Sequence, residues 1–539
     1  MKSRAITGIA LTMLLLAVVS PIDVSVGVVD FDGGSGGFVA QSGVDWWPMF
    51  RHDLNHTGYS TSTAPNTNNT IWKYTTYSDH SSPAVSGGKV YVGSYSSNPP
   101  FDYPKVYCLN ATTGAHIWNY TTRSGSYGVY SCPAVADGRV YVGSFDDGKV
   151  YCLNATTGAH IWNYTTGNWV TSSPAVSDGR VYVGSWDYKV YCLNATTGAH
   201  IWNYTTYSDH SSPAVSGGKV YVGSIDGRVY CLNATTGAYI WSCPTSSDVS
   251  SSPAVSDGRV YVGSMDSLVY CLNATTGAYI WIYPTGYGGV RSSPAVSGGK
   301  VYVGSMDSKV NFYCLNATTG AHIWNYTTGG EVRSSPAVAD GKVYVGSMDS
   351  KVNFYCLNAS TGAHIWSYKT GGYVSSSPAV ADGKVYVGSY DGKVYAFGPD
   401  TTPPNITDVS QFPFKNNVLP ADEVQVNATV TDDLSGVKQV ALNYTNGNGT
   451  WIIVDMTSLE GNVWGVTVPK FPYCTDVTYA IIAEDNANNR ITTGEMGYEY
   501  QYHVVPEWPS FIILSLFMLF TLIAVALAKK IRCKVAKTT

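Results

Sequence analysis

The chain has 539 residues, of which 13% are charged, and its formal net charge is −5 at pH 7. This sparse and slightly acidic charge provides no basic surface for a phosphate backbone, so we expect no nucleic-acid partner. The length leaves room for two or three domains.

The chain starts with a basic and then an apolar stretch. Lys2 and Arg4 precede an apolar run from Ala5 to Val19. This pattern is typical of a secretory signal peptide, which we assign to residues 1–27, with Pro21 leaving the cleavage position open. We therefore expect the rest of the chain outside the cytoplasm.

A lead-in segment, residues 45–70, precedes the repeated part of the chain. It contains His52, Asp53 and His56, which are side-chain types that coordinate metals. The alternative, which we favour, is that these residues have a structural role in the lead-in to the repeats.

Residues 71–398 repeat one text, approximated by SSPAVSDGRVYVGS followed by KVYCLNATTGAHIWNYTT. A period of about 40 residues with several short runs of Val, Tyr, Ile and Trp is typical of a β-propeller, whose small sheets pack on their neighbours. We therefore predict an all-β chain with an eight-bladed propeller of four strands per blade. The proline of the text recurs at Pro83, Pro133, Pro174, Pro213, Pro253, Pro294, Pro336 and Pro378.

The two ends of the repeated region are incomplete in complementary ways. Trp72 precedes the first SPAV text, whereas the last repeat stops at Phe397 without its own Ile-Trp pair. We predict that the segment around Trp72 supplies the fourth strand of the last blade. Such a closure leaves only short, protected sheet edges.

The text from Cys152 to Trp162, with Asn154 and Gly158, resembles a known motif. It is similar to the AxDxxTGxxxW motif by which blades of pyrroloquinoline-quinone-type propellers dock onto each other, with Cys and Asn at the Ala and Asp positions. The resemblance covers residues 45–398 and implies an eight-bladed quinoprotein-like propeller. It also implies blade docking by a set of tryptophans: Trp118, Trp162, Trp202, Trp241, Trp281, Trp324 and Trp366.

The resemblance does not decide the activity, because the family holds both quinone-dependent dehydrogenases and non-catalytic scaffolds. For the dehydrogenases it implies a pair of adjacent cysteines, a calcium site and a catalytic aspartate on long insertions. No two cysteines of this chain are adjacent, and the repeats leave no long insertion. We therefore expect no catalysis and no cofactor, with a quinone-dependent oxidoreductase as the alternative.

Seven of the 11 cysteines stand at one equivalent position of the repeats. A disulfide requires Cα atoms within about 7 Å, and equivalent positions of neighbouring blades are expected to be further apart. We therefore predict free thiols that pack as small apolar groups between blades. The seven are Cys108, Cys152, Cys192, Cys231, Cys271, Cys314 and Cys356.

Differences between aligned repeats show what the scaffold does not dictate. The loops that lead to the SPAV text vary, and so does the residue after YVGS, with aromatic residues at many of these places. Both kinds of loop emerge on one face of an up-and-down blade, so we predict a binding face there, with neutral variation in solvent as the alternative. Its residues are Tyr95, Tyr130, Phe145, Trp169, Trp186 and Tyr390.

The turn between the third and fourth strands carries an Asn-x-Ser/Thr sequence in seven repeats. On an external chain, such turns are candidate N-glycosylation sites, and the alternative is that Asn serves only as a turn residue. The candidate acceptors are Asn110, Asn154, Asn194, Asn233, Asn273, Asn316 and Asn358.

Residues 402–505 lack the repeated text and contain six or seven short alternating runs, which predicts an Ig-like or fibronectin-like β-sandwich. Asp432, Asp433, Glu484 and Asp485 lie in two of its expected loops. These carboxylates are weak candidates for a Ca²⁺ site, and solvated turn residues are the alternative.

Residues 509–528 are mostly apolar and precede a basic tail, residues 529–539. This pattern predicts one transmembrane helix with the tail in the cytoplasm. The preceding text VPEWPS resembles a processed sorting signal, which is the alternative to a retained anchor.

Taken together, the features resemble archaeal surface proteins. We expect a single-pass protein of the cell membrane whose propeller and sandwich face outward and bind an unidentified protein or glycan at the cell surface. A purely structural envelope component is a further alternative.

Overall fold

The computed structural model describes residues 44–76, 81–94, 105–122, 128–207, 211–307, 312–351, 353–432, 434–506, 516–525 and 527. The predicted signal peptide, residues 1–27, and the predicted tail, residues 529–539, lie outside this part of the chain, as do Tyr95 and Asp433.

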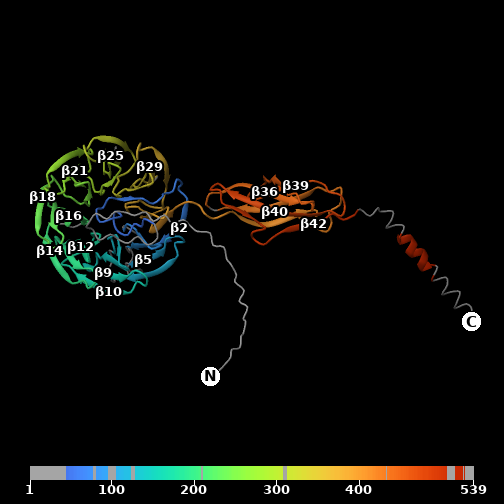
Figure 1. Cartoon of the computed structure of the whole chain (residues 1–539), viewed down its shortest axis with the longest axis horizontal. Coiled ribbons are helices and arrows are strands. Elements are labelled where there is room, and N and C mark those ends of the chain that lie inside the picture. The colour runs from blue at the N-terminus through green and yellow to red at the C-terminus, as the bar shows by residue number, and fades with distance from the viewer. Residues whose placement is uncertain are drawn as a thin grey trace, which may run out of the picture. The chain divides into compact units, whose positions relative to one another are not determined.

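The repeated region folds into successive antiparallel sheets that together form a β-propeller (Figure 1). The first sheet contains β3 (Ala84–Ser86), β4 (Lys89–Gly93), β5 (Lys105–Asn110) and β6 (His116–Thr121). The second contains β7 (Ala134–Ala136), β8 (Arg139–Gly143), β9 (Lys149–Asn154) and β10 (His160–Thr165). The third contains β11 (Ala175–Ser177), β12 (Arg180–Ser185), β13 (Lys189–Asn194) and β14 (His200–Thr205). The fourth contains β15 (Ala214–Ser216), β16 (Lys219–Ser224), β17 (Arg228–Asn233) and β18 (Tyr239–Pro244).

The remaining sheets repeat this order. The fifth contains β19 (Ala254–Ser256), β20 (Arg259–Gly263), β21 (Leu268–Asn273) and β22 (Tyr279–Pro284). The sixth contains β23 (Ala295–Ser297), β24 (Lys300–Gly304), β25 (Phe312–Asn316) and β26 (His322–Tyr326). The seventh contains β27 (Ala337–Ala339), β28 (Lys342–Gly346), β29 (Phe354–Asn358) and β30 (His364–Tyr368), and β1 (Tyr59–Ser60) pairs parallel with β27 at its inner edge. The eighth contains β31 (Ala379–Ala381), β32 (Lys384–Ser389), β33 (Lys393–Phe397) and β2 (Thr70–Thr75).

Burial within each sheet follows the position of the strand. In the third sheet, Val181 to Ser185 of β12 are all buried, because neighbouring sheets cover both faces of the inner strands. The outer strand β14 alternates and buries only Trp202 fully. This gradient explains why the inner strands read as continuous apolar runs.

The predicted closure is present. β2 pairs antiparallel with β33, and Trp72 is opposite Ala396. Figure 1 shows the start of the propeller beside its last strands. The two ends of the repeated region therefore share one sheet.

Adjacent sheets are joined by a recurring contact of Trp and Tyr with one carbonyl. The indole N–H of Trp162 and the hydroxyl of Tyr141 both donate to the carbonyl oxygen of Ala195, at 3.0 and 3.1 Å. Gly198 in the same turn has a φ of +73°, and a Cβ built there would lie 2.6 Å from the indole ring of Trp162. Equivalent indole bonds are made by Trp72, Trp118, Trp202, Trp241, Trp281 and Trp324.

Residues 405–503 form a β-sandwich of two antiparallel sheets. One contains β34 (Asn405–Phe412), β35 (Val424–Thr431), β39 (Val463–Val468) and β38 (Thr457–Ser458). The other contains β37 (Ile452–Asp455), β36 (Val437–Thr445), β40 (Asp476–Asp485), β41 (Arg490–Thr492) and β42 (Tyr500–His503). Alternate residues of β35, such as Val426, are buried in one hydrophobic cluster with Leu442 and Ile481 of the opposite sheet.

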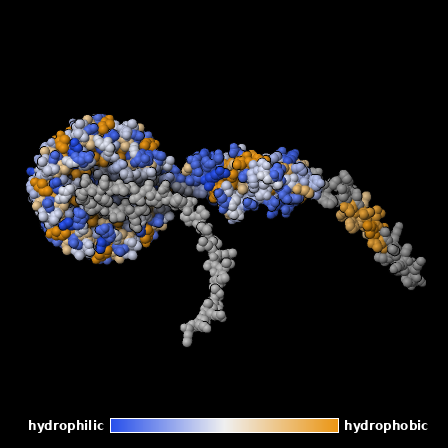
Figure 2. Space-filling view, in the orientation of Figure 1, coloured by the Kyte–Doolittle hydropathy of each residue, from blue (hydrophilic) through white to orange (hydrophobic). Residues whose placement is uncertain are grey.

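Within the predicted membrane span, residues 516–525 are helical and Figure 2 shows this stretch as hydrophobic. Residues 507–515 lie outside the described part of the chain. In that part, no helix has both the length and the apolar character that crossing a membrane requires.

Candidate functional site

The lead-in segment passes through the centre of the propeller. Residues 47–58, here called the axial plug, offer their backbone carbonyls to the innermost strand of six sheets, at 2.6–2.8 Å. The backbone N–H groups that donate to these carbonyls lie at the inner sheet edges and would otherwise be unpaired. The sequence predicts this segment as a lead-in to the repeats but does not predict its position on the propeller axis. The donors are Val85, Val135, Val215, Val255, Val296 and Val338.

Arg51 anchors the plug from within. Its guanidinium is buried and donates to the carbonyl oxygens of Pro294, at 2.6 Å, and of Pro336. Burial lowers the pKa of Arg51 to about 9, and the charge of Asp53 opposes this shift. Gly58 packs on the guanidinium so closely that a Cβ there would lie 2.2 Å from it.

The plug histidines serve this packing. His52 Nε2 lies 2.9 Å from Asp45 Oδ1, and its Nδ1 lies 3.6 Å from Asp53. Burial opposes protonation of His52, but the hydrogen bonds and charges of Asp45 and Asp53 outweigh it and raise its pKa to about 9. A protonated imidazole is not a metal ligand. The arrangement therefore supports the structural alternative for His52, Asp53 and His56.

A pocket of about 510 Å³ opens on one face of the propeller, and the axial plug forms part of its wall. We call this the loop face, because it carries the loops between sheets and the turns between the second and third strands. Phe50 of the plug lines the pocket, together with Tyr130, Phe145, Trp186 and Tyr390. These four are residues of the predicted binding face.

Three aromatic residues of the pocket lining, Tyr130, Phe145 and Trp186, form one cluster with the neighbouring Trp169. Trp169 stacks on Phe145 with ring centroids 4.2 Å apart, and Trp186 meets Trp169 edge-on at 5.2 Å. Tyr130 adds a tilted contact with Phe145 at 5.3 Å. Trp169 keeps 38% of its surface exposed, so the cluster presents apolar surface to solvent.

Serine hydroxyls surround the pocket axis. The second serine of each SSP text accepts the backbone N–H of the equivalent residue in the preceding sheet, at 2.9–3.1 Å. The second sheet has Cys132 at this position. We call the set the serine ring: Ser82, Ser173, Ser212, Ser252, Ser293, Ser335 and Ser377.

Two arginines line the pocket on one side only. Arg291 and Arg333 lead into the sixth and seventh sheets, whereas Phe145 and Trp186 belong to the second and third. The sheet of each arginine follows that of one of these aromatic residues by four positions, so in this ring the basic side lies across the axis from Phe145 and Trp186. Sequence reasoning missed the arginines, although comparing the loops GYGGVRSS and GGEVRSS with their equivalents would have found them.

The pocket does not fit the quinone chemistry of the dehydrogenases. Its described lining contains no Asp or Glu that would bind a metal or act as a base. Its one cysteine, Cys132, has no adjacent partner, and burial raises the pKa of its thiol.

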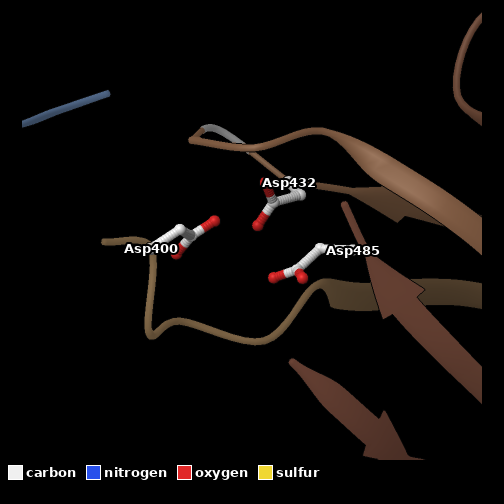
Figure 3. Close-up of side chains that lie close together, drawn as sticks. All are labelled: Asp400, Asp432 and Asp485. Carbon is white, nitrogen blue, oxygen red and sulfur yellow. The ribbon is translucent and has the colours of Figure 1, made fainter. Parts of the chain in front are cut away.

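A separate carboxylate cluster lies in the sandwich loops. Figure 3 shows Asp400, Asp432 and Asp485 turned toward one another, with their ligand atoms within 4.8 Å. All three accept hydrogen bonds from nearby N–H groups or hydroxyls. Of the predicted residues that the structure describes, the Glu484 side chain pairs with Lys438 at 2.6 Å, and only Asp432 and Asp485 come together.

The candidate glycosylation turns lie on the face opposite the pocket. Asn154 Oδ1 accepts the N–H groups of Thr156 and Thr157, both at 2.9 Å, and the equivalent asparagines do the same. Asparagine therefore has a structural role in these turns, as the alternative proposed.

Comparisons with known proteins agree with this fold. The family described as outer membrane protein assembly factor BamB matches residues 57–148, 126–213, 190–311, 265–354 and 314–467. No curated protein matches the chain significantly.

Three solved structures illustrate the likeness. A europium-containing methanol dehydrogenase has 16% identity and a TM-score of 0.56, over 66% of this chain and 98% of its own. BamB from Moraxella catarrhalis has 20% identity and a TM-score of 0.51, over 61% and 99%. The computationally designed Ika8 protein has 17% identity and a TM-score of 0.52, over 61% and 99%. At these identities the structures share the fold alone, whereas the family matches together span residues 57–467. The chain belongs to the PQQ-like repeat family described as outer membrane protein assembly factor BamB.

Proposed function

We propose that this protein is a non-catalytic binding module of the cell surface. An eight-bladed propeller presents the axial pocket and its aromatic rim to a ligand. The Ig-like sandwich and a single membrane anchor carry it. The observation that carries this proposal is the pocket itself, which joins four residues of the predicted binding face on one rigid ring.

The pocket has the properties of a recognition site. Its aromatic residues come from different loops but are held by strands that are paired on both sides, so little ordering is needed when a ligand binds. Trp186 is further fixed by its indole N–H, which donates to the hydroxyl of Thr171 at 3.0 Å. Rigid aromatic side chains of this kind supply most of the energy of an interface.

The distribution of sequons supports an outward-facing pocket. The turns at Asn154 and its equivalents lie on the opposite face, so glycans attached there leave the loop face open. This arrangement suits a surface protein whose ligand approaches from the side of the pocket.

The proposal is tested by binding of the immobilised full chain to solubilised envelope of its own host. Changing Phe145 and Trp186 to Ser should remove most of the retained material. Changing Thr156 and Thr157 to Ser, on the opposite face, should leave it unchanged. Equal behaviour of the two variants, or retention by residues 402–505 alone, would contradict the proposal.

The quinone-dependent alternative is tested with the same protein. Addition of pyrroloquinoline quinone and Ca²⁺ should give no alcohol-dependent reduction of a dye, because the described pocket lining lacks carboxylates. Turnover above that of the free quinone would overturn the non-catalytic assignment.

A further inference from the structure

We propose that the axial pocket binds a saccharide that carries a carboxylate. The carboxylate faces Arg291 and Arg333, and the sugar ring lies against the aromatic side. This inference rests on the proposed function, because it names the ligand class of the same pocket.

The serine ring supplies hydroxyl donors that donate to no group of the described residues. Each ring oxygen already accepts one backbone N–H, as Ser212 does from Ser173 at 2.9 Å. Within the described part of the chain, no acceptor lies within hydrogen-bond distance of the ring hydroxyl protons. A serine hydroxyl in this state keeps one donor and one acceptor position. A sugar hydroxyl has the same dual capacity.

The basic side of the pocket is incompletely neutralised. Arg333 is paired with Glu331 at 2.7 Å, but no described carboxylate lies within ion-pair distance of Arg291. Arg291 is exposed at the pocket wall, and no Asp or Glu belongs to the described lining. A guanidinium in this position favours a carboxylate, which it can bind through two parallel hydrogen bonds.

The aromatic side provides an apolar surface across the axis, to which Tyr130, Phe145 and Trp186 contribute in the pocket lining. Phe145 and Trp169 are nearly parallel, with an interplanar angle of 19°, and Trp186 stands against them. One face of a sugar ring consists of C–H groups and packs on such a surface. The pocket volume of about 510 Å³ is within the range of small-molecule sites.

Two other ligand classes fit the pocket less well. An uncharged sugar leaves Arg291 without a partner. A peptide with an aromatic carboxyl end satisfies the arginines and the aromatic side but offers few oxygens to a ring of hydroxyls. An acidic saccharide uses all three features at once.

The test is saturation-transfer NMR of the full chain with four probes. D-Glucuronate should bind at least tenfold more tightly than D-glucose, and phenylacetate should bind no better than glucose. Arg291→Gln should weaken glucuronate binding about tenfold, which corresponds to about 1.4 kcal/mol. Arg180→Gln, in a hairpin on the opposite face, is the matched control and should change nothing.

Each other outcome overturns the inference. Equal binding of glucose and glucuronate removes the role of the carboxylate. Binding of phenylacetate but not its uncharged counterpart 2-phenylethanol, without binding of glucuronate, favours a peptide end. No binding of glucuronate at 10 mM, on the order of the weakest useful affinities, excludes the saccharide. The proposed function fails separately, if the Phe145 and Trp186 variant still retains the envelope material.

Discussion

The indole N–H of Trp366 donates to the carbonyl oxygen of Pro65 at 3.3 Å, across 301 positions of the chain. The hydroxyl of Tyr344 donates to the same oxygen at 3.0 Å. In the other sheets the acceptor is the alanine of an Asn-Ala-Thr-Thr-Gly turn, or of the Asn-Ala-Ser-Thr-Gly turn at Ala359. The eighth sheet has no such turn, because its outer strand β2 comes from the other end of the repeated region. Pro65 therefore replaces that turn, and the ring is closed in two places, by strand β2 and by Pro65 of the lead-in segment.

This closure predicts that residues 44–76 are required for folding. Removal of residues 1–76 takes away β2, the plug and Pro65, and leaves inner sheet edges unpaired, so we expect aggregation or a broad thermal transition. Removal of residues 1–43 alone should keep one cooperative transition. Calorimetry of both truncated chains makes the comparison, and equal transitions would contradict the closure.

The close contact between Arg51 and Gly58 is tested by substituting Gly58. Gly58→Ala should destabilise the chain by about 1–2 kcal/mol for its left-handed backbone and by a further 1–3 kcal/mol for the collision with Arg51. Gly88→Ala is the matched control, because its φ is +72° and a Cβ there meets no atom within 4 Å. Urea denaturation midpoints measure the difference. Similar losses for both variants would show that Arg51 does not occupy the position described.

His52 predicts loss of stability at alkaline pH. Its pKa is raised from 6.5 to about 9 in the folded chain, against burial, by Asp45 and Asp53. The stabilisation is therefore complete below pH 6.5 and is lost as the pH rises from 6.5 to 9. We expect the melting temperature of the native chain to fall more steeply over this window than that of His52→Gln.

The control for this effect is His160→Gln, which removes an exposed histidine of the outer strand β10. It should keep the pH dependence of the native chain. The same slope in the native chain and in His52→Gln would show that His52 is not ion-paired with Asp45.

Because the cysteines of the propeller are buried, we predict that they react slowly with a thiol reagent in the native state. The ten described cysteines are free, and all but Cys474 are buried. Burial raises the pKa of Cys152 to about 12, so little reactive thiolate forms. In a chain with Cys533→Ser, a thiol reagent should react rapidly at Cys474 and at the other sites only after denaturation.

Cys474→Ser in the same background should remove the rapid phase. If few free thiols are found in the denatured, unreduced chain, the cysteines form disulfides. This result would contradict the expectation that equivalent cysteines of neighbouring sheets are too far apart to be bridged.

The repeated text was sufficient to predict the sheets, because each repeat carries the same apolar runs and turns. The complementary ends also predicted the pairing of Trp72 with the last strand. The axial plug was not predictable, since it has no period and binds the sheets through backbone carbonyls, which any residue supplies. Side chains such as those of Arg51 and His52 add specific contacts there, but they have no equivalents in the repeats.

The candidate site was predicted in part. Aromatic residues such as Phe145 and Trp186 stood out because they differ between otherwise equal repeats. The serine ring was hidden by its regularity, since an invariant serine reads as part of the scaffold. Asp400 was missed because it lies outside the loops that hold Asp432 and Asp485, and only the folded chain brings it to them.

The most direct test of the binding face is photo-crosslinking on the surface of the host. In this test, p-benzoyl-phenylalanine replaces Phe145 in the full chain. We expect crosslinked adducts from this position and none from the same group at Thr156, on the opposite face. Equal adducts from both positions, or adducts only from a sandwich position such as Thr450, would contradict the account.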